Sequence, residues 1–256
     1  MSHTQSEACC NTPAVVSTGY HEKGQWITVD GLKTYATGPS SVSQGILVVY
    51  DIFGFFAQTL QGADILAHSD KDHQYRVFMP DFFEGEPADI SWYPPKTEEH
   101  GRKLGEFFQT KAAPPKTVAR VKSVMDELKS ANPGIKEWGV VGYCWGGKAS
   151  IPIHIVNLVS GSNTVFKAAA ACHPAMVDPN DAPNVTIPMC MIPSKDEDES
   201  AVSQYESKLT VPKQIEWYKD QIHGFMAARA DLEDEKVRAA YEKAYRTLLG
   251  FFHKYL

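Results

Sequence analysis

The stretch Gly-Tyr-Cys-Trp-Gly-Gly at residues 142–147 follows a strand-like run at 138–141 and precedes a helix-like segment at 148–159. A reactive side chain with glycine two positions away on each side is typical of a nucleophile elbow, a sharp strand-to-helix turn. Glycine is needed because so sharp a turn crowds the backbone and leaves no room for a Cβ atom. The apex is Cys144, beside a backbone N–H and the start of a helix. A buried structural cysteine is the alternative, and the strand–turn–helix context favours the nucleophile.

Size and charge exclude several classes of function. The chain has 256 residues, enough for one large domain, and a formal net charge of −6, with a pI near 5.8. It has no excess of lysine and arginine, so we expect no nucleic acid partner. Residues 1–13 are polar, unlike a signal peptide, and no apolar run approaches the ~18 residues of a membrane span. These features predict a cytoplasmic protein with no membrane partner.

The cysteines indicate a reducing compartment and no disulfide framework. There are five, an odd number for a chain of this size. No Cys-x-x-Cys or His-x-x-x-His spacing occurs, so a metal site made of Cys172, His173 and His223 has no support from spacing. We therefore expect neither a metal nor a cofactor.

Apolar runs alternate between strand and helix periodicity, which predicts a mostly parallel sheet with helices on both faces. The stretch 84–115 is outside this alternation, and we interpret it as a partly helical excursion over the ligand-binding edge of the sheet, or else an ordinary surface connection. The predicted strands are 25–30, 33–37, 46–50, 76–80, 138–141, 166–171, 187–192 and 214–218, and the predicted helices are 58–68, 116–130, 148–159 and 234–255.

A thiol nucleophile needs a base, and in sheets with a nucleophile elbow the histidine comes last in chain order. His223 follows the last predicted strand and precedes the closing helix, and it alone among the nine histidines has this placement. His173 also follows a strand, but it precedes the acidic candidates and so breaks the order. We therefore predict that His223 is the base.

The base needs an orienting acid, and the predicted strand 187–192 leads into an acidic cluster. Asp196 is in the expected position and is the favoured residue. Glu197 and Asp198 are alternatives, because the cluster could equally be a solvated loop.

Two backbone N–H groups are the predicted oxyanion hole. One belongs to Trp145, directly after the nucleophile, and the other to Ile52, in the loop after the strand 46–50. Each such donor stabilises a transition state by roughly 3 kcal/mol.

Three motifs together resemble the dienelactone hydrolase (carboxymethylenebutenolidase-like) family, with fungal members the nearest in pattern. They are Tyr-Asp-Ile-Phe-Gly at 50–54, the elbow at 142–147, and His-Gly-Phe at 223–225. The resemblance runs from about Gly24 to the C-terminus, which implies a tail at 1–23 and one α/β-hydrolase domain at 24–256. It also implies a cofactor-independent Cys-His-Asp triad that opens a small-molecule lactone or ester through an acyl-enzyme. For the assembly we expect a monomer or a small homo-oligomer.

The chain departs from the family pattern at two places that bear on the substrate. Asp51 stands where bacterial members have a glutamate that engages the resting thiol, and Ala227 stands where they have a carboxylate-binding arginine. The substrate is therefore expected to be less acidic and more apolar than a dienelactone. A binding protein that kept the fold and lost the chemistry is the alternative function. The candidate substrate-binding residues are Asp51, Phe53, Tyr143, Trp92 and Arg229.

Overall fold

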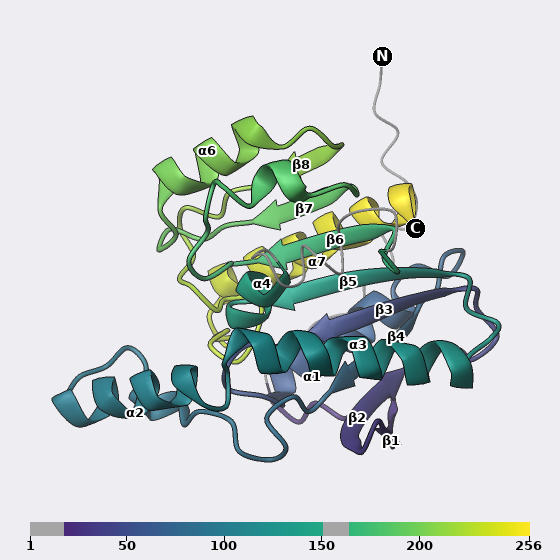
Figure 1. Ribbon diagram of the computed structural model, residues 1–256, viewed down its shortest axis with the longest axis horizontal. Coiled ribbons are helices and arrows are strands. Elements are labelled where there is room, and N and C mark those ends of the chain that lie inside the picture. Colours follow the sequence, from purple (N-terminus) through teal and green to yellow (C-terminus); the bar gives the residue numbers. More distant parts are fainter. Residues whose placement is uncertain (1–17, 151–163) are drawn as a thin grey trace.

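An eight-stranded sheet forms the centre of the structure, a computed structural model that describes residues 18–150 and 164–256 (Figure 1). The spatial order of the strands is β1-β2-β4-β3-β5-β6-β7-β8. The strands are β1 (Gln25–Val29), β2 (Leu32–Thr37), β3 (Gln44–Val49), β4 (Arg76–Pro80), β5 (Glu137–Tyr143), β6 (Ala168–Cys172), β7 (Met189–Ile192) and β8 (Lys213–Ile215).

The sheet is parallel from β4 to β8 in spatial order, as the alternating pattern predicts. Only β2 runs against its two neighbours, β1 and β4. The β1–β2 hairpin turns at Asp30 and Gly31, which both have positive φ angles, of 49° and 73°. Two such residues in succession are what a tight two-residue hairpin turn requires. The strands predicted at 25–30 and 33–37 pair as this hairpin, and the predicted α/β-hydrolase type of sheet is confirmed.

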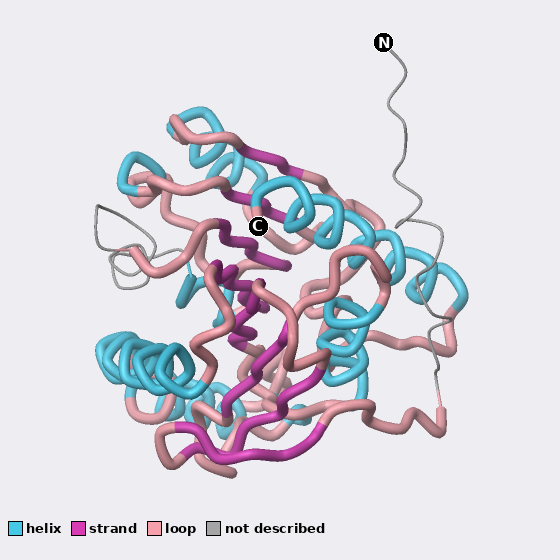
Figure 2. The backbone as a smooth tube through the Cα atoms, turned by 90° about the vertical axis from the view of Figure 1, so that its right-hand side faces the viewer, coloured by secondary structure: helices cyan, strands magenta, loops and turns pink. Residues whose placement is uncertain are grey.

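Helices cover both faces of the sheet. Figure 2 shows helices on both sides of the strands, and Figure 1 shows that α1 and α7 pack together on one face while α3 and α4 lie on the other. The helices are α1 (Ala57–His68), η2 (Ile90–Trp92), α2 (Glu98–Gln109), α3 (Pro114–Ala131), α4 (Trp145–Ser150), η3 (Ala182–Asn184), α6 (Glu199–Lys208) and α7 (Glu235–Tyr255). The helix predicted at 148–159 is seen only as α4, because its remainder lies outside the described residues.

The core lies between the central strands and the two helix layers. All five residues of β6 are buried, as are six of the seven in β5, because both faces of these strands are covered. On α7, which the sequence predicts at 234–255, the apolar face is buried at Tyr241, Ala244, Leu248 and Phe252. No helix in the described ranges has the length and apolar character of a membrane span.

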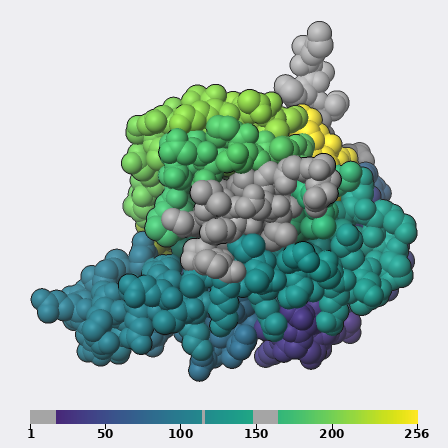
Figure 3. All heavy atoms as spheres, in the orientation of Figure 1, coloured from purple at the N-terminus to yellow at the C-terminus, as the bar shows by residue number. Residues whose placement is uncertain are grey.

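The excursion at 84–115 is partly helical, as predicted. It contains η2 and α2, and α2 begins where the Thr97 hydroxyl accepts a hydrogen bond from the His100 N–H. Figure 3 shows this part of the chain projecting from the body of the molecule at one end. α2 buries only Leu104 and Phe107. This segment therefore projects beside the edge of the sheet that carries the candidate catalytic residues.

α6 was not predicted from the sequence. It begins after Asp198, whose carboxylate accepts hydrogen bonds from the N–H groups of Ser200 and Ala201. It buries only Val202 and Tyr205, so its apolar periodicity is weak. One member of the acidic cluster is therefore a helix cap.

Candidate active site

Cys144 lies at the apex of a nucleophile elbow between β5 and α4. It has a φ of 53°, a left-handed conformation that residues with side chains seldom adopt. A Cβ atom at Gly142 would lie 2.1 Å from the Gly146 carbonyl oxygen, and one at Gly146 would lie 2.1 Å from that of Val49. Both obstacles are backbone atoms, so only glycine fits at either position. The structure therefore has the strand–turn–helix geometry that the sequence predicts.

Backbone hydrogen bonds hold the elbow against the neighbouring strand. The Cys144 N–H donates to the Cys172 carbonyl at 3.0 Å, and the Cys144 carbonyl accepts from the Ala175 N–H at 3.1 Å. The Cys144 residue is 8% exposed, and it forms part of the wall of a pocket. The thiol is thus fixed in place and reachable from that pocket.

His223 lies beside the thiol, in the loop that follows β8. Its ring and the Cys144 side chain line the same pocket, and the charge of Cys144 acts on the ring. Its Nδ1 lies 2.6 Å from Oε1 of Glu197. Burial acts to lower the pKa of His223, but the charges of Cys144 and Glu197 and the hydrogen bond to Glu197 outweigh it and raise the pKa to about 11. An imidazolium beside a thiol is an arrangement that activates cysteine nucleophiles.

The carboxylate at the imidazole ring belongs to Glu197, and this corrects the placement favoured for Asp196. Asp196 Oδ2 instead accepts a hydrogen bond from the backbone N–H of His223 at 2.8 Å. The two residues are consecutive in the loop after β7, so their side chains leave the backbone in different directions. Glu197 also accepts from the Ser194 N–H, which anchors its second oxygen. Asp196 therefore holds the loop of His223, and Glu197 holds its ring.

The two predicted oxyanion donors belong to the residue directly after Cys144 and to a residue of the same pocket wall. Trp145 is the first residue of α4, and its indole N–H donates to the Ala112 carbonyl at 3.0 Å. Ile52 follows β3 and lines the same pocket as Cys144. Within the described part of the chain, the Ile52 N–H has no hydrogen-bond acceptor. A backbone N–H without an acceptor at the pocket wall is available to bind a substrate oxygen.

Asp51 is fully buried and faces backbone donors. Its Oδ1 accepts from the Phe53 N–H at 2.9 Å, and its Oδ2 accepts from the Ala228 N–H at 3.2 Å. It thereby ties the loop of Ile52 to the loop of His223. Burial raises the pKa of Asp51 to about 6, although the two backbone hydrogen bonds oppose the shift. These contacts favour a positioning role for Asp51 over direct binding of substrate.

The pocket beside Cys144 has a volume of about 480 Å³. Its polar wall consists of His223 and the acidic cluster at 196–198, and no lysine or arginine lines it within the described residues. A largely apolar pocket of this size suits a small molecule. The apolar wall includes Phe53, Tyr93, Phe108, Pro174, Met176 and Val177.

Of the five predicted substrate-binding residues, Phe53 lines the pocket and the others do not. Tyr143 is 1% exposed and packs below the elbow against Tyr245, because it is the last residue of a buried strand. Trp92 lies under the Lys103 ammonium group, while the next residue, Tyr93, reaches the pocket. The sequence could have suggested Tyr93 only through its proximity to Trp92.

Arg229 supports the pocket from behind. Its guanidinium donates to the His223 carbonyl at 2.5 Å and lies 5.0 Å from the centre of the Tyr93 ring. It thus braces one residue of the pocket wall and the backbone of the candidate base. An anionic substrate group would have to displace these contacts to reach it.

His173 forms the wall behind His223. It is fully buried, its ring centre lies 5.1 Å from that of His223, and neither ring nitrogen has a hydrogen-bond partner among the described residues. Burial and the neighbouring His223 charge lower the pKa of His173 well below its usual value. The ring is therefore neutral, and it packs against His223 without adding charge.

A family model for the dienelactone hydrolase family matches residues 32–256. This chain belongs to the dienelactone hydrolase family. The match includes β2, the elbow, all three acidic candidates and His223. Membership places the chain among hydrolases that act on small molecules.

Relatives along the full length agree with this family. An uncharacterized AIM2 family protein of Schizosaccharomyces pombe is 33% identical over 255 residues, which cover 96% of this chain and 98% of the relative. A carboxymethylenebutenolidase homolog of Xenopus tropicalis is 28% identical, with 98% and 99% covered.

Solved structures support the fold. A dienelactone hydrolase from Anabaena variabilis superimposes with a TM-score of 0.60 over 92% of this chain and 98% of that one. Its sequence identity is 15%, so the likeness concerns the fold alone. The central sheet and flanking helices of this dienelactone hydrolase-family protein are those of an α/β hydrolase.

Proposed function

We propose that this dienelactone hydrolase-family protein cleaves a lactone, ester or related acyl bond through a thioester on Cys144. The observation that carries the proposal is that the His223 ring lines the same pocket as Cys144, with its Nδ1 2.6 Å from Glu197. Nucleophile, base and orienting acid are the three parts that such chemistry needs. They come from three separate loops at one edge of the sheet.

In the proposed first half-reaction, the Cys144 thiolate forms a bond to the acyl carbon, and the carbonyl electron pair moves onto oxygen. The N–H groups of Ile52 and Trp145 stabilise that oxyanion. When the oxyanion collapses, the C–O bond to the alcohol breaks. The departing oxygen takes the proton of the His223 imidazolium, which leaves a thioester and a neutral imidazole.

In the second half-reaction, neutral His223 takes a proton from water as the water oxygen attacks the thioester. A second oxyanion forms in the same pair of N–H groups. Its collapse expels the Cys144 thiolate beside a protonated His223, which restores the starting state. Glu197 keeps Nδ1–H donating throughout, so the other ring nitrogen faces the thiol and the water.

The charge of the pocket bears on the substrate class. Asp196, Glu197 and Asp198 line one side of it, no lysine or arginine lines it within the described ranges, and the charge of His223 is already matched by Cys144 and Glu197. A negatively charged substrate would enter an acidic, largely apolar pocket without a counter-ion, which is unfavourable. We therefore expect a neutral ester or lactone with an apolar acyl group as the substrate.

The proposal predicts that Cys144→Ala abolishes hydrolysis of a neutral aryl ester, a loss of kcat/KM of at least about 10⁴. Alkylation of Cys144 should inhibit the wild-type enzyme in proportion to the labelled fraction. Mass spectrometry of quenched wild type should find the acyl group on the peptide with Cys144. A matched control is Cys190→Ala, which removes a fully buried thiol of β7.

Full activity of the Cys144→Ala protein would refute the thioester mechanism. If wild type turns over no aryl ester or enol lactone but still binds these compounds, the alternative of a small-molecule binding protein is favoured. The first result would show that Cys144 is not the nucleophile, and the second would show that the protein is not a hydrolase of these compounds.

A further inference from the structure

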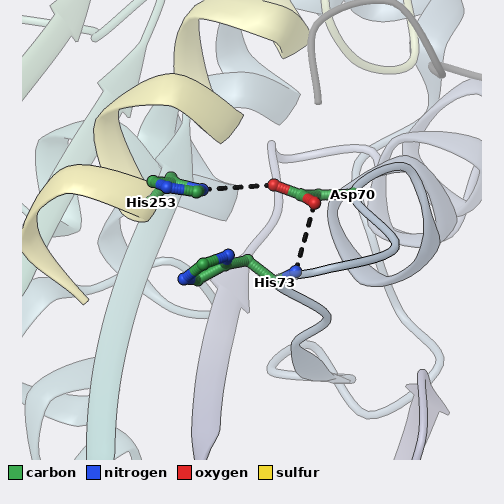
Figure 4. A group of neighbouring side chains, drawn as sticks. All are labelled: Asp70, His73 and His253. Carbon is green, nitrogen blue, oxygen red and sulfur yellow. Dashed lines mark hydrogen bonds and ion pairs between the residues drawn. The ribbon is translucent and has the colours of Figure 1, made fainter. Parts of the chain in front are cut away.

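Asp70, His73 and His253 converge on the surface near the C-terminus of the chain (Figure 4). His253 is in the last turn of α7, and the other two residues are in the connection between α1 and β4. The Nδ1 of His253 lies 3.2 Å from Oδ2 of Asp70, 183 positions away in sequence. The two imidazole rings have their centres 3.8 Å apart. Nothing in the proposed hydrolysis uses this cluster.

The three side chains offer two imidazole nitrogens and one carboxylate oxygen, all within 4.8 Å of one another. In a tetrahedral site with bonds of about 2.0–2.1 Å, ligand atoms lie roughly 3.4 Å apart. Both histidines are exposed, so small rotations of their rings can bring the ligand atoms from within 4.8 Å to this tetrahedral spacing. Two imidazoles and a carboxylate are a ligand set suited to zinc and neighbouring divalent metals.

The carboxylate is held in place as a metal ligand requires. The Asp70 side chain is 4% exposed, and its Oδ1 accepts hydrogen bonds from the N–H groups of Asp72 and His73 at 2.9 and 3.1 Å. These bonds leave Oδ2 facing the histidines. Hydrogen bonds that orient a ligating carboxylate are a regular feature of metal sites.

We propose that Asp70, His73 and His253 bind one divalent first-row metal ion, with zinc as the cation that their chemistry fits best. On binding, the proton between Nδ1 of His253 and Oδ2 of Asp70 leaves to solvent, and both atoms turn their lone pairs to the metal. Water fills the remaining coordination position. This inference goes beyond the expectation from sequence, which finds no metal-ligand spacing because His253 lies so far along the chain.

The site lies at the opposite edge of the sheet from Cys144. His73 lies three positions before the start of β4, whereas Cys144 directly follows the end of β5, and both strands run parallel to β3. A metal there does not touch the hydrolytic groups. It cross-links the last turn of α7 to the α1–β4 connection, and this cross-link stabilises the folded state.

The test uses the full chain carrying Cys144→Ala, Cys9→Ser and Cys10→Ser, so that zinc has no reactive thiol at those positions. Calorimetric titration with Zn²⁺ should give one site per chain. Saturation at a hundredfold excess over Kd should raise Tm by about 5–10 °C. Co²⁺ should give the visible absorption of a metal held by nitrogen and oxygen ligands.

In that background, His73→Ala and His253→Ala should each raise the Kd for Zn²⁺ at least about tenfold and remove the Co²⁺ spectrum. His21→Ala, at an exposed histidine outside the cluster, is the matched control and should change Kd less than twofold. The proposal is overturned if Zn²⁺ neither binds nor shifts Tm. It is equally overturned if His73→Ala and His21→Ala bind alike. Because the cysteine background has no nucleophile, neither result depends on the proposed hydrolysis.

Discussion

Three consecutive carboxylates in the loop after β7 have three different partners. Asp196 binds the His223 N–H, Glu197 binds the His223 ring, and Asp198 caps α6. Three chemically similar carboxylates thus hold the backbone of His223, hold its ring and cap α6. Loop geometry alone decides which carboxylate does which, so the sequence could narrow the choice of acid to this cluster and no further.

Asp51 carries a testable dependence of stability on pH. Its pKa is about 6 in the folded protein because burial disfavours the charge, and about 4 in an unfolded chain. A group with a raised folded pKa contributes stability that is complete below the unfolded value and is lost as pH rises through the folded one. From pH 4 to 7, we expect Asp51 to lower the free energy of unfolding by about 2 kcal/mol.

Urea unfolding of wild type and Asp51→Asn across pH 4–8 measures this effect. The variant also loses one hydrogen-bond acceptor, which shifts its stability equally at every pH. The difference between the two proteins should therefore change in favour of the variant as pH rises and level off above about 7. A difference that stays constant over the whole range would contradict the assigned cause.

At the scale of elements, the elbow depends on close approach between β3, β5 and α4. A Cβ atom at Gly146 would lie 2.1 Å from the Val49 carbonyl oxygen and 2.6 Å from that of Tyr50. Neither backbone atom can move without displacing β3. We expect Gly146→Ala to lower the free energy of unfolding by at least about 3 kcal/mol, or to prevent folding.

Gly105→Ala is the matched control, measured in the same urea unfolding experiment. Gly105 is inside α2, and a Cβ atom there would meet nothing within 4 Å. Alanine is the better helix former, so this variant should gain about 0.5–1 kcal/mol. Equal effects at the two glycines would mean that the elbow tolerates a side chain.

At the scale of the whole molecule, the alternation of strands and helices and the chain order of Cys144 and His223 could be predicted. Both follow from local apolar periodicity and from loops that end parallel strands at one edge. The spatial order of the strands could not be read from periodicity, since the choice of neighbour is decided by packing across the whole sheet. α6 was missed because few of its residues are apolar.

The direction of the side chains explains why some predicted substrate-binding residues do not line the pocket. Tyr143 lies next to the nucleophile in sequence, yet it packs in the core. Trp92 and Tyr93 are neighbours, yet only Tyr93 lines the pocket. Adjacency in sequence therefore locates a functional loop without saying which of its side chains faces the substrate.

In the proposed mechanism Cys144 works through a His223 ring that Glu197 orients. Measuring kcat/KM for a neutral aryl ester in Glu197→Gln and in Asp196→Asn tests which carboxylate orients the ring. Glu197→Gln should lower kcat/KM by about 10²–10⁴, because the ring loses its charged acceptor. Asp196→Asn keeps an oxygen for the His223 N–H and should lose about tenfold or less. A larger loss in Asp196→Asn than in Glu197→Gln would contradict the account.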